Sequence, residues 1–347
     1  MHIEDFDYLL PQELIAQTPI EPRDAARLLV DQGAHEPLHR QMTNFVDFCQ
    51  PGDVLVVNDT KVIPARLRCV RASGGSAEVL LLEQRDSSNA NWEALVRPGG
   101  KLKQGETLFA SDGTALVRID SRTPAGDTFF VTLLTNELSR ELSSEPSSDL
   151  AQLLQRYGEM PLPPYITTSL AQADRYQTVY ANRPASAAAP TAGLHFTQSL
   201  LVALQTKGIK ILTVDLTVGL DTFAPITAQN PLEHPIHTES YRVSAQTLQQ
   251  CHAAQRVIAV GTTATRALES AATTGVLAGR TNLFISRGYE FKIVDLLLTN
   301  FHMPRTTLLL LVDAFIGSRW RVIYDIAIQE RYRMLSFGDA MLLDRTL

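Results

Sequence analysis

The sequence predicts an α/β fold, in which a large mixed-sheet α/β domain carries a small inserted antiparallel β-barrel domain. Two observations support this fold class. The 347 residues are enough for about two domains. Short apolar runs separated by turn residues fill residues 53–135, whereas strand-like and helical patterns alternate after residue 149. We expect residues 1–58 and 158–347 to form the large catalytic domain and residues 59–157 the barrel, because an insertion leaves both flanks together.

The first half of the chain consists mainly of predicted strands. Before them, "PQELIAQTP" (11–19) has the pattern of one short helix. The strand-like runs are rich in Val, Leu and Phe, and they cover 53–58, 62–70, 77–83, 92–98, 115–120 and 128–134. Gly, Asn, Asp or Pro separate these runs, a pattern typical of a small barrel or sandwich.

The second half of the chain alternates between the two kinds of secondary structure. "SDLAQLLQRYG" (148–158) has leucines at helical spacing, Ser and Asp as N-cap candidates, and a closing glycine. Beyond it, strands are expected at 209–214, 257–261, 282–286 and 294–299, and helices at 245–255, 263–275 and 306–317. This alternation predicts α/β layers.

Composition places the chain among folded, globular proteins. It has 45% hydrophobic and 20% charged residues, and its apolar runs are far shorter than a membrane helix requires. The N-terminus lacks the order of a signal peptide, and three scattered cysteines fit neither a disulfide framework nor a metal motif. We therefore expect a cytoplasmic protein. The net charge of −6 argues against indiscriminate nucleic-acid binding but leaves room for a local basic face.

Three loops that follow predicted strands or small residues could carry chemistry. In "AVGTTATRALES", Gly261, Thr262 and Thr263 open a helix whose free amides suit a carboxylate, a phosphate or a ribose, although a simple N-cap explains the same residues. His195 in "PTAGLHF" and His302 in "TNFHMP" can act as acid or base near neutral pH. A hydrogen-bonded core histidine remains the alternative for both.

Two further clusters are weaker candidates. "EHPIHTE" contains His234, His237 and Glu239, but its spacing and its proline do not favour a metal site. "RYRMLSFGDAML" holds Arg331 and Arg333 and is either a final strand with solvated arginines or a phosphate contact beside a polar site. Arg66 and Arg68, like Lys101 and Lys103, alternate along predicted barrel strands and could form a basic face or protect an edge.

Longer segments carry a resemblance to a known family. They include "FDYLLPQELIAQTPIEPRDAARLLV", "PGDVLVVNDTKVIPARL", "WEALVRPGGKLKQGE", "GEMPLPPYI", "AAPTAGLHFT", "VGTTATRALES" and "GYEFKIVDLLLTNFHMPRTTLLLLVDAFIG". In this order they resemble the S-adenosylmethionine:tRNA ribosyltransferase-isomerases of queuosine biosynthesis over nearly the whole chain. The resemblance implies a large α/β domain with an inserted β-barrel. It also implies a monomer without a metal or redox cofactor, in which S-adenosylmethionine is a consumed substrate.

The resemblance also implies a reaction. The ribosyl part of S-adenosylmethionine is transferred to the 7-aminomethyl-7-deazaguanine wobble base of tRNA and isomerised, giving epoxyqueuosine-tRNA and releasing adenine and methionine. On this basis we expect the proton-handling residues to be His195 (as base or shuttle), His302 and Asp339. We expect S-adenosylmethionine to contact Thr191, Gly193, Gly261, Thr262 and Thr263. The phosphates of the tRNA anticodon arm are expected to meet Arg23, Arg66 and Arg333.

The chain departs from the family pattern at a few positions. "DLTVGLDTF" has Thr217 and Asp221 where the family commonly carries histidine and glycine, and Met334 and Leu335 replace aromatic residues. Three alternatives therefore stay open: a diverged member with another acceptor, an ordinary methyltransferase, and a non-catalytic RNA-binding protein. The first strand-like run lacks the Gly-rich loop of a methyltransferase, and the net negative charge disfavours a pure RNA binder.

Overall fold

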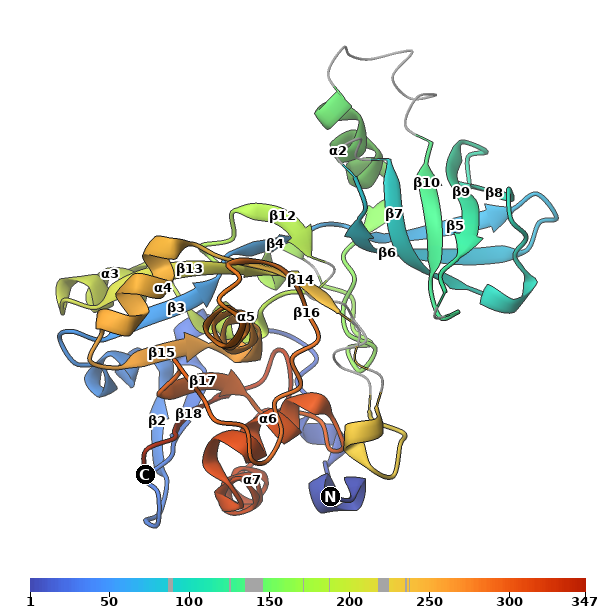
Figure 1. The fold of residues 1–347 in the computed structure, drawn as a ribbon. Helices are drawn as coiled ribbons and strands as arrows, with labels where there is room; N and C mark the ends of the chain where they lie inside the picture. The colour runs from blue at the N-terminus through green and yellow to red at the C-terminus, as the bar shows by residue number, and fades with distance from the viewer. Residues whose placement is uncertain are drawn as a thin grey trace. The chain divides into compact units, whose positions relative to one another are not determined.

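The computed structural model describes residues 1–86, 90–124, 126–134, 146–170, 172–186, 188–217, 225–234, 236 and 238–347. The chain divides into two compact units. The larger comprises Met1–Thr60, Pro163–Arg183 and Ala189–Leu347, and the smaller comprises Lys61–Leu162 and Pro184–Ala188 (Figure 1). In the described part of the chain, no helix is long and apolar enough to cross a membrane.

The larger unit is built on a nine-stranded mixed sheet. Its order is β16 (Ala278–Thr281), β14 (Glu239–Val243), β13 (Lys210–Leu216), β3 (Val54–Asn58), β15 (Val257–Val260), β17 (Leu296–Asn300), β18 (Ala340–Asp344), β1 (Arg27–Val30) and β2 (Leu38–Gln41). The four central strands, β13, β3, β15 and β17, are mutually parallel. The carboxyl ends of these strands therefore meet at one edge, where open α/β sheets bind ligands.

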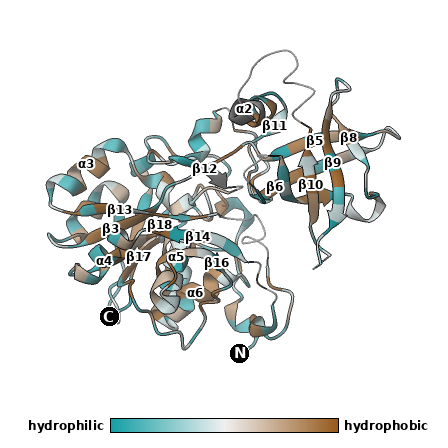
Figure 2. Cartoon of the chain, turned by 45° about the horizontal axis from the view of Figure 1, so that its top comes forward, coloured by the Kyte–Doolittle hydropathy of each residue, from teal (hydrophilic) through white to brown (hydrophobic). Residues whose placement is uncertain are grey.

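Continuous apolar runs explain why the central strands are buried on both faces. Every residue of β3, β15 and β17 is buried, as parallel strands covered by helices require. Apolar residues accordingly concentrate along the strands of the large sheet (Figure 2). Helix α5 (Gly261–Thr274) packs against β3, β13, β14, β15 and β17.

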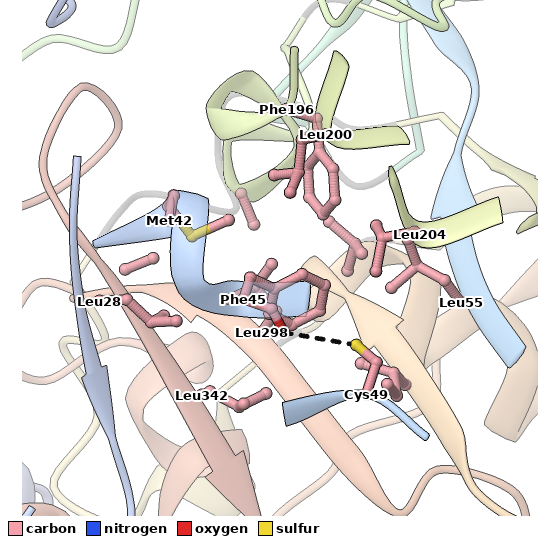
Figure 3. Close-up of a cluster of buried hydrophobic side chains, with 14 of the residues drawn as sticks. Leu28, Met42, Phe45, Cys49, Leu55, Phe196, Leu200, Leu204, Leu298 and Leu342 are labelled. Atoms are coloured by element: carbon pink, nitrogen blue, oxygen red, sulfur yellow. Dashed lines mark hydrogen bonds between the residues drawn. The ribbon is translucent and has the colours of Figure 1, made fainter. Parts of the chain in front are cut away.

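One apolar cluster joins the sheet to its covering segments. Leu55 and Leu298 point from the sheet toward Phe45 of η4 (Met42–Phe48) and Leu204 of α3 (Gln198–Thr206) (Figure 3). The thiol of Cys49 donates to the carbonyl of Phe45 at 3.5 Å, so this cysteine is a core residue. The remaining helices of the unit are α4 (Ala245–Ala253), α6 (Thr307–Ile316) and α7 (Arg319–Gln329).

Short 3-10 helices make up much of the irregular part of the larger unit. They are η1 (Ile3–Phe6), η2 (Gln12–Leu14), η3 (Arg23–Ala25), η6 (Ala173–Tyr176), η7 (Thr191–His195) and η9 (Pro231–Glu233).

The smaller unit is a closed antiparallel barrel. Its strands are β5 (Arg66–Arg71), β6 (Ser76–Gln84), β7 (Asn91–Arg97), β10 (Phe129–Leu133), β9 (Ala115–Arg122) and β8 (Thr107–Phe109), and β8 pairs back with β5. Along β5, Leu67 and Cys69 are buried and Arg68 is exposed, the alternation expected of a barrel wall. The unit also contains η5 (Gly99–Lys101), α2 (Pro146–Tyr157) and β11 (Gly158–Glu159), which pairs with β5; β4 (Thr60–Val62) pairs with β12 (Arg183–Ser186). The predicted fold class is confirmed.

Some predicted elements differ from the structure. The strand predicted at 282–286 is wrong, since the edge strand β16 ends at Thr281 and the following residues are irregular. Ile285 is buried, with 2% of its surface exposed, but it does not pair in a sheet. Its burial accounts for the apolar residue at this position. The helix predicted at 11–19 shrinks to the single turn of η2. The strand-like run predicted at 53–58 is β3 (Val54–Asn58) of the large sheet.

Candidate active site

The cavity that holds most of the residues predicted to bind S-adenosylmethionine, here called the main cavity, lies at the carboxyl ends of the neighbouring strands β15 and β17. The space inside it, together with the adjoining open solvent, is about 570 Å³. Its walls come from the segment before and within η7, the first turn of α5, the loop after β17 and the turn before β18: Tyr165, Ala189, Pro190, Thr191, Ala192, Gly261, Thr262, Thr263, Thr299, Asn300, Phe301, His302, Met303, Thr306, Leu308, Leu335 and Ser336. Five predicted site residues therefore share this cavity.

The first turn of α5 presents unpaired donors to the cavity. Gly261 follows β15 directly and has a φ of +85°, a conformation that only glycine adopts without strain. Among the described residues, no side chain caps this helix, so the N–H groups of its first turn are not satisfied by a cap. The hydroxyl of Thr263 is buried and has no partner in the same part of the chain. The helix dipole adds positive potential at the same point. The simple N-cap interpretation of Thr262 and Thr263 does not hold, and this end of α5 can accept a carboxylate or a hydroxyl oxygen.

His302 faces the same cavity from the loop after β17. Its Nε2 lies 3.0 Å from the hydroxyl of Thr299, and its backbone N–H donates to Tyr324 at 2.9 Å. The hydroxyl of Tyr8 donates to its carbonyl, so the loop is held from two sides. Burial lowers the pKa of His302 to about 3. The ring is therefore neutral at neutral pH and able to accept a proton in a dry environment.

His195 lies in η7 beside a second, smaller cavity of about 260 Å³. Burial, together with the guanidinium charges of Arg333 and Arg23, lowers its pKa to about 4. The residues that line this second cavity are Pro19, Ile20, Arg23, Arg175, Leu194, His195, Ser336, Phe337 and Gly338. The structure thus separates the two predicted histidines, and only Ser336 lines both cavities.

Asn300 connects the two cavities, and sequence reasoning missed it. Its Oδ1 accepts from the hydroxyl of Thr191 at 3.0 Å, and its Nδ2 lies 3.2 Å from Nε2 of His195. The same Nδ2 faces the carbonyls of Leu335 and Asp339 at 3.2 and 3.4 Å. The available signal was position, because Asn300 is the last residue of β17, where a parallel strand delivers side chains to the ligand-binding edge.

Asp339 lies outside both cavities. Its two carboxylate oxygens accept from the backbone amides of Arg27 and Arg333, each at 2.8 Å. Burial raises its pKa, and these hydrogen bonds oppose the rise. The carboxylate therefore holds the turn before β18 in place, and the structure does not bring it to the reacting side of the pocket.

Gly193 also has a different environment from the one predicted. A Cβ atom there would lie 2.0 Å from the hydroxyl oxygen of Tyr180 and 2.8 Å from Cγ2 of Thr178. The space on the side where a Cβ would lie is filled by the protein itself, and Gly193 does not line the main cavity. Glycine is required at this position for packing within η7.

The three arginines predicted to meet tRNA have different surroundings. Arg23 donates to the carbonyls of Gln177, Leu194 and Asp174, and Arg333 donates to the carbonyl of Thr18. Both are half-buried, and burial lowers the pKa of each guanidinium.

The third predicted arginine belongs to the smaller unit. Arg66 lies 3.9 Å from Glu78, and its neighbour on the same strand, Arg68, pairs with Glu159 at 2.8 Å. Carboxylates therefore balance the arginine part of the predicted basic face. The side chain of Lys101, another predicted member of that face, lies outside the description.

Comparison with known proteins decides the family. A family model described as "Queuosine biosynthesis protein" matches residues 3–343. The chain belongs to the queuosine biosynthesis protein family. The S-adenosylmethionine:tRNA ribosyltransferase-isomerase of Rubrobacter xylanophilus is 46% identical over 348 residues, which cover 99% of this chain and 98% of that protein. The protein of the same name from Moorella thermoacetica is 48% identical over 357 residues, covering 99% and 100%.

A solved structure is also similar to this chain. The crystal structure of an S-adenosylmethionine tRNA ribosyltransferase from Thermotoga maritima matches with a TM-score of 0.53 and 35% identity, covering 97% of this chain and 99% of that one. The family predicted from the sequence is confirmed.

The structure describes only some of the positions at which the sequence departs from the family pattern. The backbone N–H of Thr217 donates to the carbonyl of Ser240 at 2.9 Å, whereas Asp221 lies outside the described residues. Of the weak metal candidates, Glu239 forms a buried ion pair with Arg266, and His237 lies outside the description. Among the residues that are described, no group of three His, Cys, Asp or Glu could hold a metal ion.

Proposed function

We propose that this chain transfers the ribosyl part of S-adenosylmethionine to the 7-aminomethyl-7-deazaguanine wobble base of tRNA and isomerises it, giving epoxyqueuosine-tRNA with release of adenine and methionine. The observation that carries this proposal is the match along nearly the whole chain to relatives named for this activity. The cavity also supports the proposal. Its small residues leave space for a nucleoside, the amides of α5 can donate to a carboxylate, and its neutral histidine can accept a proton.

S-adenosylmethionine occupies the main cavity in this proposal. The first amides of α5, from Gly261 to Thr263, bind the methionine carboxylate or a ribose hydroxyl, since both offer acceptors to unpaired donors. Thr191 lines the same cavity, and its hydroxyl is oriented by the hydrogen bond that it donates to Asn300. Gly193 acts indirectly, by letting η7 pack closely against Tyr180.

His302 is the group best placed to remove the proton from the ribosyl carbon next to the sulfonium. It lines the same cavity as the α5 donors, its side chain is buried, and its ring is neutral, the form that can accept a proton. The positive sulfur makes the adjacent C–H acidic, so the step requires no metal or redox cofactor. His195 is separated from this cavity by Asn300, and its predicted role as base or shuttle stays a prediction.

The tRNA contributes its anticodon arm in this proposal. Arg23, Arg66 and Arg333 meet its phosphates, and the protein acts as a cytoplasmic monomer. Because each of these arginines is already engaged by carbonyls or a carboxylate, each contact with RNA would be made by the remaining guanidinium donors.

The test is an incubation with S-adenosylmethionine and tRNA that carries the 7-aminomethyl-7-deazaguanine base. The expected result is free adenine together with an equivalent gain in tRNA mass, unaffected by a metal chelator. Methylated RNA would instead indicate a methyltransferase. Binding of tRNA without adenine would indicate another acceptor or a non-catalytic RNA-binding protein.

Histidine variants separate the roles within the site. A positioned general base contributes at least about a hundredfold, so His302→Ala should lower kcat by about that factor. His252→Ala, an exposed histidine on α4, is the matched control and should keep normal turnover. Near-normal turnover in both His302→Ala and His195→Ala would overturn the assignment of the base.

A further inference from the structure

The second cavity is walled by hydrogen-bond donors. Three of its polar side chains, Arg23, Arg175 and His195, come from separate segments of the larger unit, and Ser336 is the fourth. None of the described residues that line it is acidic. A cavity of this kind has nothing to offer a cation and is suited to an anion.

The positive charge of the arginines that line this cavity is only partly neutralised by nearby carboxylates. Glu21 pairs with Arg175 but is 71% exposed, so it neutralises the outer side of that guanidinium. Asp174 is also exposed, and both carboxylate oxygens of Asp339 already accept hydrogen bonds from backbone amides. At the position of His195 the charges that act are those of Arg333 and Arg23, and both are positive.

An unpaired donor remains in one of these arginines. Nε of Arg175 is buried and has no hydrogen-bond partner within the described part of the chain. Buried guanidinium N–H groups without acceptors are costly, and the structure around them provides none. An anion with several acceptor oxygens would supply what is missing, as a phosphate does.

Asn300 determines which edge of His195 faces the cavity as a donor. The carbonyls of Leu335 and Asp339 require the NH₂ group of Asn300 on their side, while Thr191 donates to its oxygen. This NH₂ group can only donate, so Nε2 of His195 accepts and Nδ1 carries the proton. No described residue bonds Nδ1. His195 therefore presents an N–H donor on the edge that points away from Asn300.

We infer that the second cavity is a phosphate subsite, in which Arg23, Arg175 and the Nδ1–H of His195 hold one backbone phosphodiester of the RNA substrate. The inference rests on the proposed function. Its location fits an RNA substrate, because Ser336 lines both cavities. A nucleotide whose base enters the main cavity thus has its neighbouring phosphate within reach of the second.

The test is the salt dependence of substrate tRNA binding, measured without S-adenosylmethionine between about 50 and 200 mM salt. Each phosphate contact to single-stranded RNA adds about 0.7 to the slope of log Kd against log salt. Arg175→Gln should lower the slope by about that amount and weaken binding several-fold. Arg40→Gln, which removes the same charge from an exposed position on β2, should leave both unchanged.

A second measurement uses inorganic phosphate as the probe at constant ionic strength. Phosphate should raise the melting temperature of the wild type and of Arg40→Gln but not of Arg175→Gln. Arg175→Lys keeps the charge but loses the planar donor fork, so it should keep the slope and lose affinity. It also serves as the folding control for the Gln variant.

The outcomes separate this inference from the proposed function. An unchanged slope in Arg175→Gln, or equal stabilisation of all variants by phosphate, would overturn the subsite. Weaker binding of S-adenosylmethionine with unchanged tRNA binding would overturn it too, because the anion would then be the methionine carboxylate. A reduced slope in a protein that releases no adenine would keep the subsite and refute the reaction.

Discussion

Gly193→Ala should destabilise the larger unit through one steric conflict. The added Cβ would lie 2.0 Å from the hydroxyl oxygen of Tyr180, 3.0 Å from its Cζ and 2.8 Å from Cγ2 of Thr178. The ring of Tyr180 packs edge-on against Phe196 at 6.3 Å, so it has little freedom to move away. Inserting one methyl group into a packed site costs about 1–3 kcal/mol, and contacts this short place the variant at the upper end of that range.

A second substitution tests the origin of this cost. Tyr180→Phe removes the closest atom, and by itself it should be nearly neutral because that hydroxyl is buried and has no partner among the described residues. In the double variant, the loss of stability should be smaller than the sum of the two single losses by at least about 1 kcal/mol, which is the coupling energy of the two substitutions. The remaining conflict with Thr178 prevents full recovery.

The assay is urea-induced unfolding of the wild type, both single variants and the double variant. Gly338→Ala is the informative contrast, because its Cβ would lie 2.3 Å from the backbone oxygen of Arg333, which no side-chain change can relieve. It should cost more than Gly193→Ala and show no recovery with Tyr180→Phe. The steric argument fails if Gly193→Ala is as stable as the wild type or if the two substitutions are additive.

Three other changes test the site and its supports. The folded pKa values of His195 and His302 lie near 4 and 3, below the usual 6.5, so the unfolded chain binds more protons as pH falls below 6.5. The free energy of unfolding should therefore fall between pH 6.5 and 4, by roughly 3 kcal/mol for His195 alone, and urea unfolding of His195→Asn should show a flatter pH dependence. Glu269→Gln should lose about 1–3 kcal/mol in thermal unfolding, because the buried carboxylate accepts from three consecutive backbone amides, whereas the exposed Glu290→Gln should be neutral. Gly261→Ala should raise the KM for S-adenosylmethionine in the adenine assay and cost about 1–2 kcal/mol, since its φ of +85° strains any other residue; an unchanged KM would remove the first turn of α5 from the site.

Local sequence patterns were sufficient to predict the helices and strands whose own residues determine their conformation. The helices predicted at 263–275 and 306–317 are α5 and α6. Helix α5 has a periodic apolar face, α6 is a long apolar run that is buried almost all round, and a glycine ends each helix. The strand at 257–261 is β15, a continuous apolar run too short for a helix. The family followed from long ordered segments, and its model matches residues 3–343.

Other elements depend on partners distant in the chain. β1 pairs with β18, more than three hundred residues away, and β14 pairs with β13 and β16. Sequence patterns predicted neither β1 nor β14. Burial alternates along β14 and β1 has a short apolar run, but four or five residues are too few to identify a strand without its partners. The run at 282–286 shows the converse, because Ile285 is buried and Leu283 and Phe284 are partly buried without pairing in a sheet.

The sequence by itself determined the fold class, the family and the loops that carry the polar site residues, because those properties depend on residue order and local pattern. Only the tertiary structure decided which of these residues meet. His302 lines the main cavity with the first turn of α5, whereas His195 lines the second cavity with Arg175. Asn300 lies between the two histidines, and the carboxylate of Asp339 is bound by backbone amides. Such distinctions depend on where hydrogen-bond partners from distant segments come together, and no pattern along the chain records that.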